Sequence, residues 1–167
     1  MLKFITIVLI VSAGSLSGYF KALKLSERVK FWDDFIRFIS YIKTSIKYNC
    51  DDLIHIIVCY KKTDKLSFLE SINEDNLVNC DFLTLWDSCI SKIPKSYGLT
   101  KDDYDLLGKF SLGLGVTDVE GQITHCQLYE TFFLQQKQEA AVNQNKRSKL
   151  YRLLGVFSGI CIALIIA

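Results

Sequence analysis

The chain has little of what catalytic and metal-binding sites usually require. It contains two histidines and six cysteines among 167 residues, and no two cysteines form a CxxC pair, so the usual pattern of a zinc or redox site is absent. It also has no GxxxxGK[ST], HExxH or GxSxG motif, which removes the common phosphate-binding, metalloprotease and serine hydrolase signatures. We therefore predict a non-enzymatic protein that holds no cofactor and no metal. The cysteines are expected to be reduced thiols.

Proline is almost missing as well. The single proline is Pro94, and hairpin dipeptides are rare, which argues against a fold of many strands. Apolar residues instead recur at intervals of three and four, the spacing of one helix face. The expected helices are Glu27 to Tyr48, Asp52 to Lys61, a third marked by Leu66 to Ile72, a fourth marked by Phe82 to Ile93, a fifth opened by Thr100, and one from Asp118 toward the C-terminal segment. Helix caps are expected at Asp51 or Asp52, in a capping box of Thr100 and Asp103, and at Asp118, and the fifth helix is expected to end at Gly113 and Gly115. We predict an all-α antiparallel bundle of about six helices in the middle of the chain.

The charge is divided unevenly along the sequence. Two basic collars stand out: Lys21, Lys24, Arg28 and Lys30, and Lys146, Arg147, Lys149 and Arg152. Between Phe31 and Asn145 there are roughly 11 basic and 17 acidic residues, a net charge of about −6. An acidic domain argues against nucleic acid as a partner, because phosphate binding needs a basic face. The basic collars suit the anionic headgroups of membrane lipid.

Each collar borders an apolar segment. Phe4 to Phe20 is uncharged over about 17 residues and Leu153 to Ala167 is apolar over about 15, near the lower limit for a helix that crosses a membrane. We predict transmembrane segments over 1–24 and 150–167, the second spanning the membrane or acting as a tail anchor, and a domain over 25–149. Because Lys and Arg stay inside, the domain is expected in the cytoplasm and both termini outside.

The first apolar segment has a second interpretation. Small residues at Ser12 to Ser15 follow a short apolar run, as they do before the cleavage site of a signal peptide. In that case the domain would be exported and disulfide-bonded.

Four glycines in the apolar segments have the spacing of a helix-packing motif. Gly14 and Gly18 are four residues apart, and so are Gly155 and Gly159. Such GxxxG pairs let helix backbones approach closely in lipid, although glycine is common in membrane helices without a specific role.

Two groups in the middle domain could carry chemistry or bind a partner. Asp102, Asp103 and Asp105 stabilise the start of a helix or form a docking patch for a basic partner. They do not complete a calcium loop, since Leu114 stands where the bidentate Glu is required. His125 lies beside Cys126, but neighbouring helix residues point about 100° apart and no third group completes a nucleophilic site.

The stretch Phe110 to Glu130, FSLGLGVTDVEGQITHCQLYE, resembles the stage III sporulation protein AB family of endospore-forming bacteria. The residues that carry the resemblance are Phe110, Leu114, Gly115, Asp118, Gln122 and His125. Met1 to Lys3, Ser26 to Arg28 and the terminal GxxxG-like run are also similar to the family. The corner Lys47 to Leu53 departs from it, because the family tends to have an acidic residue and Thr-Pro-Leu there.

The resemblance implies a helical domain similar to the cytoplasmic domain of the F-type platform protein of type II secretion. It also implies that the chain is a component of a channel complex between mother cell and forespore. Its implied location is the mother-cell membrane that faces the forespore. The implied partners are the secretion-type ATPase AA and other stage III sporulation proteins, and a homo-oligomer stays open. By analogy, Asp102, Asp103 and Asp105 are expected to contact the ATPase, whereas Gly115, Asp118 and Gln122 are expected to be structural. The alternative is a membrane-anchored helical scaffold or adaptor unrelated to sporulation.

Overall fold

A computed structural model describes residues 2–49, 53–61, 66–72 and 81–166. These residues form five α-helices and two 3₁₀ segments and contain no strand. The helices are α1 (Leu2–Asn49), α2 (Leu53–Lys61), α4 (Phe82–Ser91), α5 (Lys101–Ser111) and α6 (Val119–Ile166), and the 3₁₀ segments are η1 (Ser67–Ser71) and η2 (Lys95–Tyr97). The predicted all-α class is thus confirmed for this part of the chain. A bundle of about six helices and the likeness to a type II secretion domain stay predictions.

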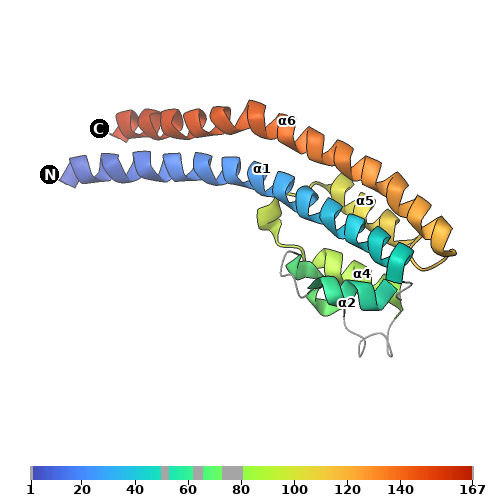
Figure 1. Ribbon diagram of the computed structural model, residues 1–167. Helices are drawn as coiled ribbons and strands as arrows, with labels where there is room; N and C mark the ends of the chain where they lie inside the picture. The colour runs from blue at the N-terminus through green and yellow to red at the C-terminus, as the bar shows by residue number, and fades with distance from the viewer. Residues whose placement is uncertain (1, 50–52, 62–65, 73–80, 167) are drawn as a thin grey trace. The chain divides into compact units, whose positions relative to one another are not determined.

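The chain divides into two units. Unit 1 is made of residues 1–29 and 138–167, and unit 2 is Lys30–Lys137. Both α1, coloured blue to teal in Figure 1, and α6, coloured orange to red, contribute residues to both units. The limits of the two units are set by contacts within the protein and not by a membrane. They therefore do not test the predicted membrane boundaries at residues 24 and 150.

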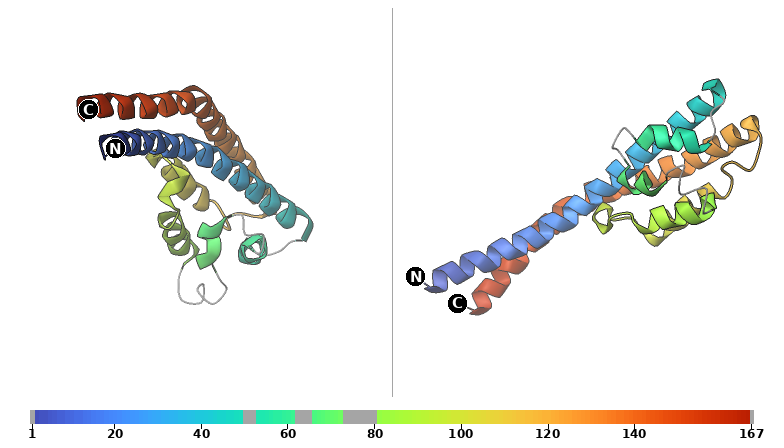
Figure 2. Two further views of the ribbon diagram at one scale, coloured as in Figure 1. Left: turned by 90° about the vertical axis from the view of Figure 1, so that its left-hand side faces the viewer. Right: turned by 90° about the horizontal axis from the view of Figure 1, so that it is seen from below.

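The core of unit 2 is built around aromatic side chains of α1. Phe35 is fully buried, and its ring lies 5.0 Å from that of Phe133 in α6 and 5.9 Å from that of Phe110 in α5, measured between ring centres. It also faces Trp86 of α4 at 6.4 Å. Figure 2 gives two further views of the helices that surround this part of α1. The predicted apolar face of the first helix is confirmed at its buried positions: Trp32, Phe35, Ile39, Ile42 and Ile46.

The smaller elements pack on this core in the predicted order, with one correction. α4 packs against α5 and η1, and α2 packs against η1. The expected third helix is wrong for the described residues, since Ser67–Ser71 is a 3₁₀ segment of five residues. All four apolar residues of this segment are nevertheless buried: Leu66, Phe68, Leu69 and Ile72. Their spacing therefore indicates which side chains are buried and not that the segment is an α-helix. The cap expected at Asp51 or Asp52 lies outside the described residues.

Ion pairs join α1 to α6 within unit 2. Asp33 accepts hydrogen bonds from Lys137 and Arg37, both at 2.6 Å, and Lys43 forms an ion pair with Glu130. The hydrogen bond from Lys137 lowers the pKa of Asp33 below its usual value, against a smaller opposing effect of burial. The charged carboxylate therefore favours the folded state.

We expect the Asp33→Asn variant to be less stable than the native chain at neutral pH. Because the folded-state pKa is depressed, this stability is present above the unfolded pKa of about 3.9 and is lost as the pH falls through the folded value. The difference in melting temperature between the two chains should therefore shrink in acid. A difference that stays constant from pH 7 to acid conditions would contradict this assignment.

Candidate interaction surface

The six residues of the family-like motif meet at the corner between α5 and α6. Phe110 is fully buried at the end of α5, and Leu114 is 4% exposed in the turn that follows. Gly115 has a φ of 75°, a left-handed conformation that side chains other than glycine rarely adopt. The turn glycine expected from the sequence therefore has a physical reason.

Asp118 and Gln122 start α6. The carboxylate of Asp118 accepts a hydrogen bond of 3.0 Å from the backbone N–H of Gly121, which is the predicted helix cap. The side-chain amide of Gln122 donates to the carbonyl oxygen of Thr117 at 2.9 Å. Both side chains thus hold the turn.

His125 ties the two helices together. Its Nε2 donates to the carbonyl oxygen of Phe110 at 2.8 Å, and its ring stacks on the Phe110 ring with centres 5.7 Å apart and planes at 12°. This bond satisfies one of the carbonyl groups that a helix end leaves open. His125 therefore acts here as part of the corner.

The neighbouring Cys126 does not form a nucleophile with His125. Its thiol is fully buried, and burial raises its pKa to about 11. A thiol with that pKa stays protonated at neutral pH, and the thiolate is the reactive form. Among the described residues, Cys59, Cys89, Cys126 and Cys161 form no disulfide bond. No group of three metal-ligating side chains occurs within the described ranges.

The sequence did not single out Gly113 for a contact, yet it makes the corner possible. A Cβ placed on Gly113 would lie 2.3 Å from a carbon of the His125 ring. The glycine therefore makes room for the imidazole. The sequence predicts only that Gly113 and Gly115 end the helix that begins at Thr100.

We expect Gly113→Ala to destabilise the chain by about 1–3 kcal/mol, because the added methyl group forces His125 off the Phe110 carbonyl and leaves polar groups unpaired. The effect should be much smaller when His125 is already alanine. A double-mutant cycle on thermal or urea unfolding measures this coupling. Equal costs of Gly113→Ala in both backgrounds would show that the histidine is not the cause.

The three acidic residues at the start of α5 differ in exposure and in role. Thr100 and Asp103 form the predicted capping box, in which Asp103 accepts from the Thr100 N–H at 2.8 Å. Asp103 is fully buried, so its place in a docking surface is a mistaken prediction. Asp102 and Asp105 are exposed.

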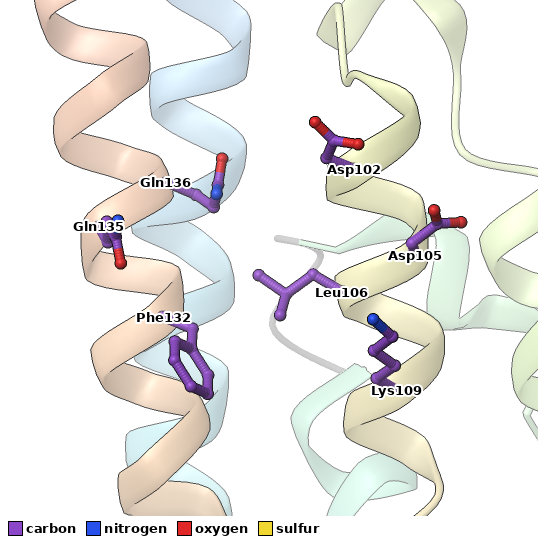
Figure 3. Close-up of a pocket in the computed structure, with 7 residues that line it drawn as sticks. All are labelled: Asp102, Asp105, Leu106, Lys109, Phe132, Gln135 and Gln136. Carbon is purple, nitrogen blue, oxygen red and sulfur yellow. The ribbon is translucent and has the colours of Figure 1, made fainter.

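A groove of about 210 Å³ lies between α5 and α6. Asp102, Asp105, Leu106 and Lys109 line it from α5, and Phe132, Gln135 and Gln136 line it from α6. Figure 3 shows Leu106 pointing from α5 toward α6, with the three charged side chains along α5. Within the described part of the chain, Asp102, Asp105 and Lys109 form no ion pair or hydrogen bond through their side chains. The groove thus combines two apolar side chains, Leu106 and Phe132, with two free carboxylates and one free ammonium.

In unit 1 the four predicted glycines lie against each other. A Cβ on Gly14 would be 2.7 Å from the carbonyl oxygen of Gly155 and 3.0 Å from the Cα of Gly159. A Cβ on Gly18 would be 2.4 Å from the carbonyl oxygen of Tyr151. The α1 and α6 backbones of this unit therefore pass too closely for side chains at these positions.

The basic collars are exposed except at one residue. Arg28 is 6% exposed and pairs with Glu139 at 3.9 Å inside unit 1, so it is not free to reach lipid headgroups as the sequence suggested. The other collar residues are exposed: Lys21, Lys24, Lys30, Lys146, Arg147, Lys149 and Arg152.

One described helix is long and apolar enough to cross a membrane. This is α1, over Ile7–Tyr48, where the most apolar window has a mean hydropathy of 1.3 and only 11% of it is buried. The C-terminal span stays a prediction, and the side chains of its last residues, 163–167, lie outside the description.

These features define an all-α protein with an apolar N-terminal helix and, within the described residues, an exposed groove that carries free charge. A comparison with known families gives its identity: the chain belongs to the stage III sporulation protein AB family, whose model matches residues 3–167. It is 25% identical to Stage III sporulation protein AB of Bacillus subtilis (strain 168) over 171 residues, which cover 99% of each chain. No solved structure matches it. The resemblance seen in the motif is confirmed, and the chain is a member of a sporulation family.

Proposed function

We propose that this chain is a non-enzymatic platform of the sporulation channel between mother cell and forespore. It anchors the cytoplasmic secretion-type ATPase AA at the mother-cell membrane that faces the forespore, beside other stage III sporulation proteins. The observation that carries the proposal is the groove of unit 2, whose carboxylates at Asp102 and Asp105 have no partner among the described residues. Free charge at a groove is suited to recognition of an oppositely charged protein.

The proposed topology has two membrane spans. The apolar segments of α1 and α6 cross the bilayer, unit 2 faces the cytoplasm, and both termini are outside. The exposed lysines and arginines of the two collars support this orientation, since basic residues stay on the cytoplasmic side. The close approach at Gly14, Gly18, Gly155 and Gly159 supports packing of the spans, because small residues allow helices to associate in lipid.

The test is retention of the ATPase at the membrane in sporulating cells. Asp102→Lys with Asp105→Lys should release the ATPase into the soluble fraction, because charge reversal places repulsion at the groove. Glu70→Lys with Glu120→Lys is the matched control, since it makes the same change of charge at exposed acids outside the groove. Equal retention in both double variants would refute the docking site. Normal spore formation without the gene would favour the scaffold unrelated to sporulation.

A further inference from the structure

The outward face of α5 is bordered by a hollow on each side. One is the groove shared with α6, described above. The other lies between α4 and α5, has a volume of about 470 Å³, and includes Leu83, Ile90 and Leu112 among its apolar lining. Asp105 and Lys109 line both hollows. α5 is therefore a ridge between two grooves.

Gly108 lies on this ridge and has no structural reason to be glycine. A Cβ placed on it would meet no atom within 4 Å, whereas a Cβ on Gly113 or Gly14 would clash. Glycine weakens a helix interior relative to alanine, so the fold of α5 by itself disfavours it. Gly108 lines the hollow shared with α4, where a missing side chain lets another backbone come close to α5.

The surface around Gly108 combines apolar side chains with an acidic rim, which is formed by Asp87, Asp102 and Asp105. Leu112 is 62% exposed and adds apolar surface to the hollow that Leu83 and Ile90 also line. Asp87, Asp102 and Asp105 surround the two hollows with Lys109 as the one base among the charged residues that line them. None of these four side chains forms an ion pair within the described residues. Such a rim repels nucleic acid and anionic lipid and attracts a cationic protein surface.

We propose that this ridge docks an amphipathic helix of a partner protein. The helix crosses α5 at Gly108, inserts apolar side chains into the hollows on both sides, and places Lys or Arg side chains beside Asp87, Asp102 and Asp105. Recognition of a helix by apolar grooves uses anchors spaced three and four residues apart, and the acidic rim selects basic flanks. This inference rests on the proposed function, for which it states the chemistry of the docking partner.

The experiment uses the full chain in nanodiscs of neutral phosphatidylcholine and a helical probe peptide made of Leu on one face and Lys on the other. Fluorescence anisotropy measures the affinity. Gly108→Leu should weaken binding about tenfold or more, which is about 1.4 kcal/mol. Gln127→Leu, which adds the same side chain at an exposed position of α6 outside both hollows, should leave the affinity unchanged. The peptide with Glu in place of Lys should bind at least about tenfold more weakly than the Lys peptide.

Two further measurements separate the outcomes. The melting temperature of Gly108→Leu should equal or exceed that of the native chain. Asp105→Asn, which removes the charge at nearly constant volume, should weaken binding as well. Native affinity in Gly108→Leu, or no binding of the Lys peptide to the native chain, overturns the proposal. A change of oligomeric state in Gly108→Leu would make the occupant a second copy and also overturn it.

Spore yields distinguish this proposal from the proposed function. Gly108→Leu should fail to restore heat-resistant spores in a deletion strain that Gln127→Leu restores. Restoration by both chains overturns the docking ridge alone, whereas normal spores in the deletion strain overturn the proposed function and the ridge together.

Discussion

Replacing Phe35 with alanine is expected to remove about 3–5 kcal/mol from the free energy of unfolding of unit 2, because a fully buried aromatic ring is lost and a cavity remains. Its ring lies 5.0–6.4 Å from the rings of seven others: Phe31, Trp32, Phe38, Phe68, Trp86, Phe110 and Phe133. These rings come from α1, η1, α4, α5 and α6. Typical domains are stable by about 5–15 kcal/mol, so this one change removes a large part of the free energy of unfolding.

The measurement is urea unfolding of the full chain in detergent, followed by the fluorescence of Trp32 and Trp86, whose rings contact Phe35. Phe132→Ala is the matched control. Its ring is 41% exposed at the groove, and its loss should cost about 1 kcal/mol or less. Equal losses in the two variants would show that the core is not centred on Phe35.

The second large effect is expected at Gly18. Leucine at this position should separate the α1 and α6 segments of unit 1, because even its Cβ would lie 2.4 Å from the carbonyl oxygen of Tyr151. A backbone atom cannot move aside as a side chain can, so the helices must shift. Leu16→Ala is the control, since Leu16 is 54% exposed in the same helix.

Cross-linking measures this separation. The guanidinium carbon of Arg152 lies 5.9 Å from the centre of the Tyr19 ring, so cysteines at these two positions should react with a short bifunctional maleimide. With Gly18→Leu the cross-linked product should largely disappear, whereas it should persist with Leu16→Ala. Full cross-linking in both chains would mean that the two segments do not depend on close glycine packing.

The local features of the fold followed from the sequence. The cap of α6 at Asp118 and the capping box of α5 depend on residues three apart, so their chemistry can be identified from spacing alone. The apolar face of α1 and the GxxxG spacings were equally visible, because helix periodicity is a local property.

The features that the sequence did not reveal depend on contacts between distant positions. Asp103 is fully buried and does not belong to the exposed acidic group. Its spacing from Thr100 identifies it as a capping residue but does not show that distant parts of the chain cover its side chain. Likewise, the groove formed by Leu106 and Phe132 and the room that Gly113 leaves for His125 depend on how α5 meets α6. The third segment, at Ser67–Ser71, kept its apolar spacing but formed a 3₁₀ turn, because five residues are too few for that spacing to distinguish the two helix types.

The central claim is that unit 2 lies in the cytoplasm on a chain anchored in the membrane. Its most direct test is the reaction of single cysteines, placed at the exposed Ser91 or Gln127 after replacement of the six native cysteines, with a membrane-impermeant maleimide in intact sporulating cells. We expect protection until the cells are opened and full labelling afterwards. Labelling of both positions in intact cells would place unit 2 outside, contradict the platform, and favour the exported domain.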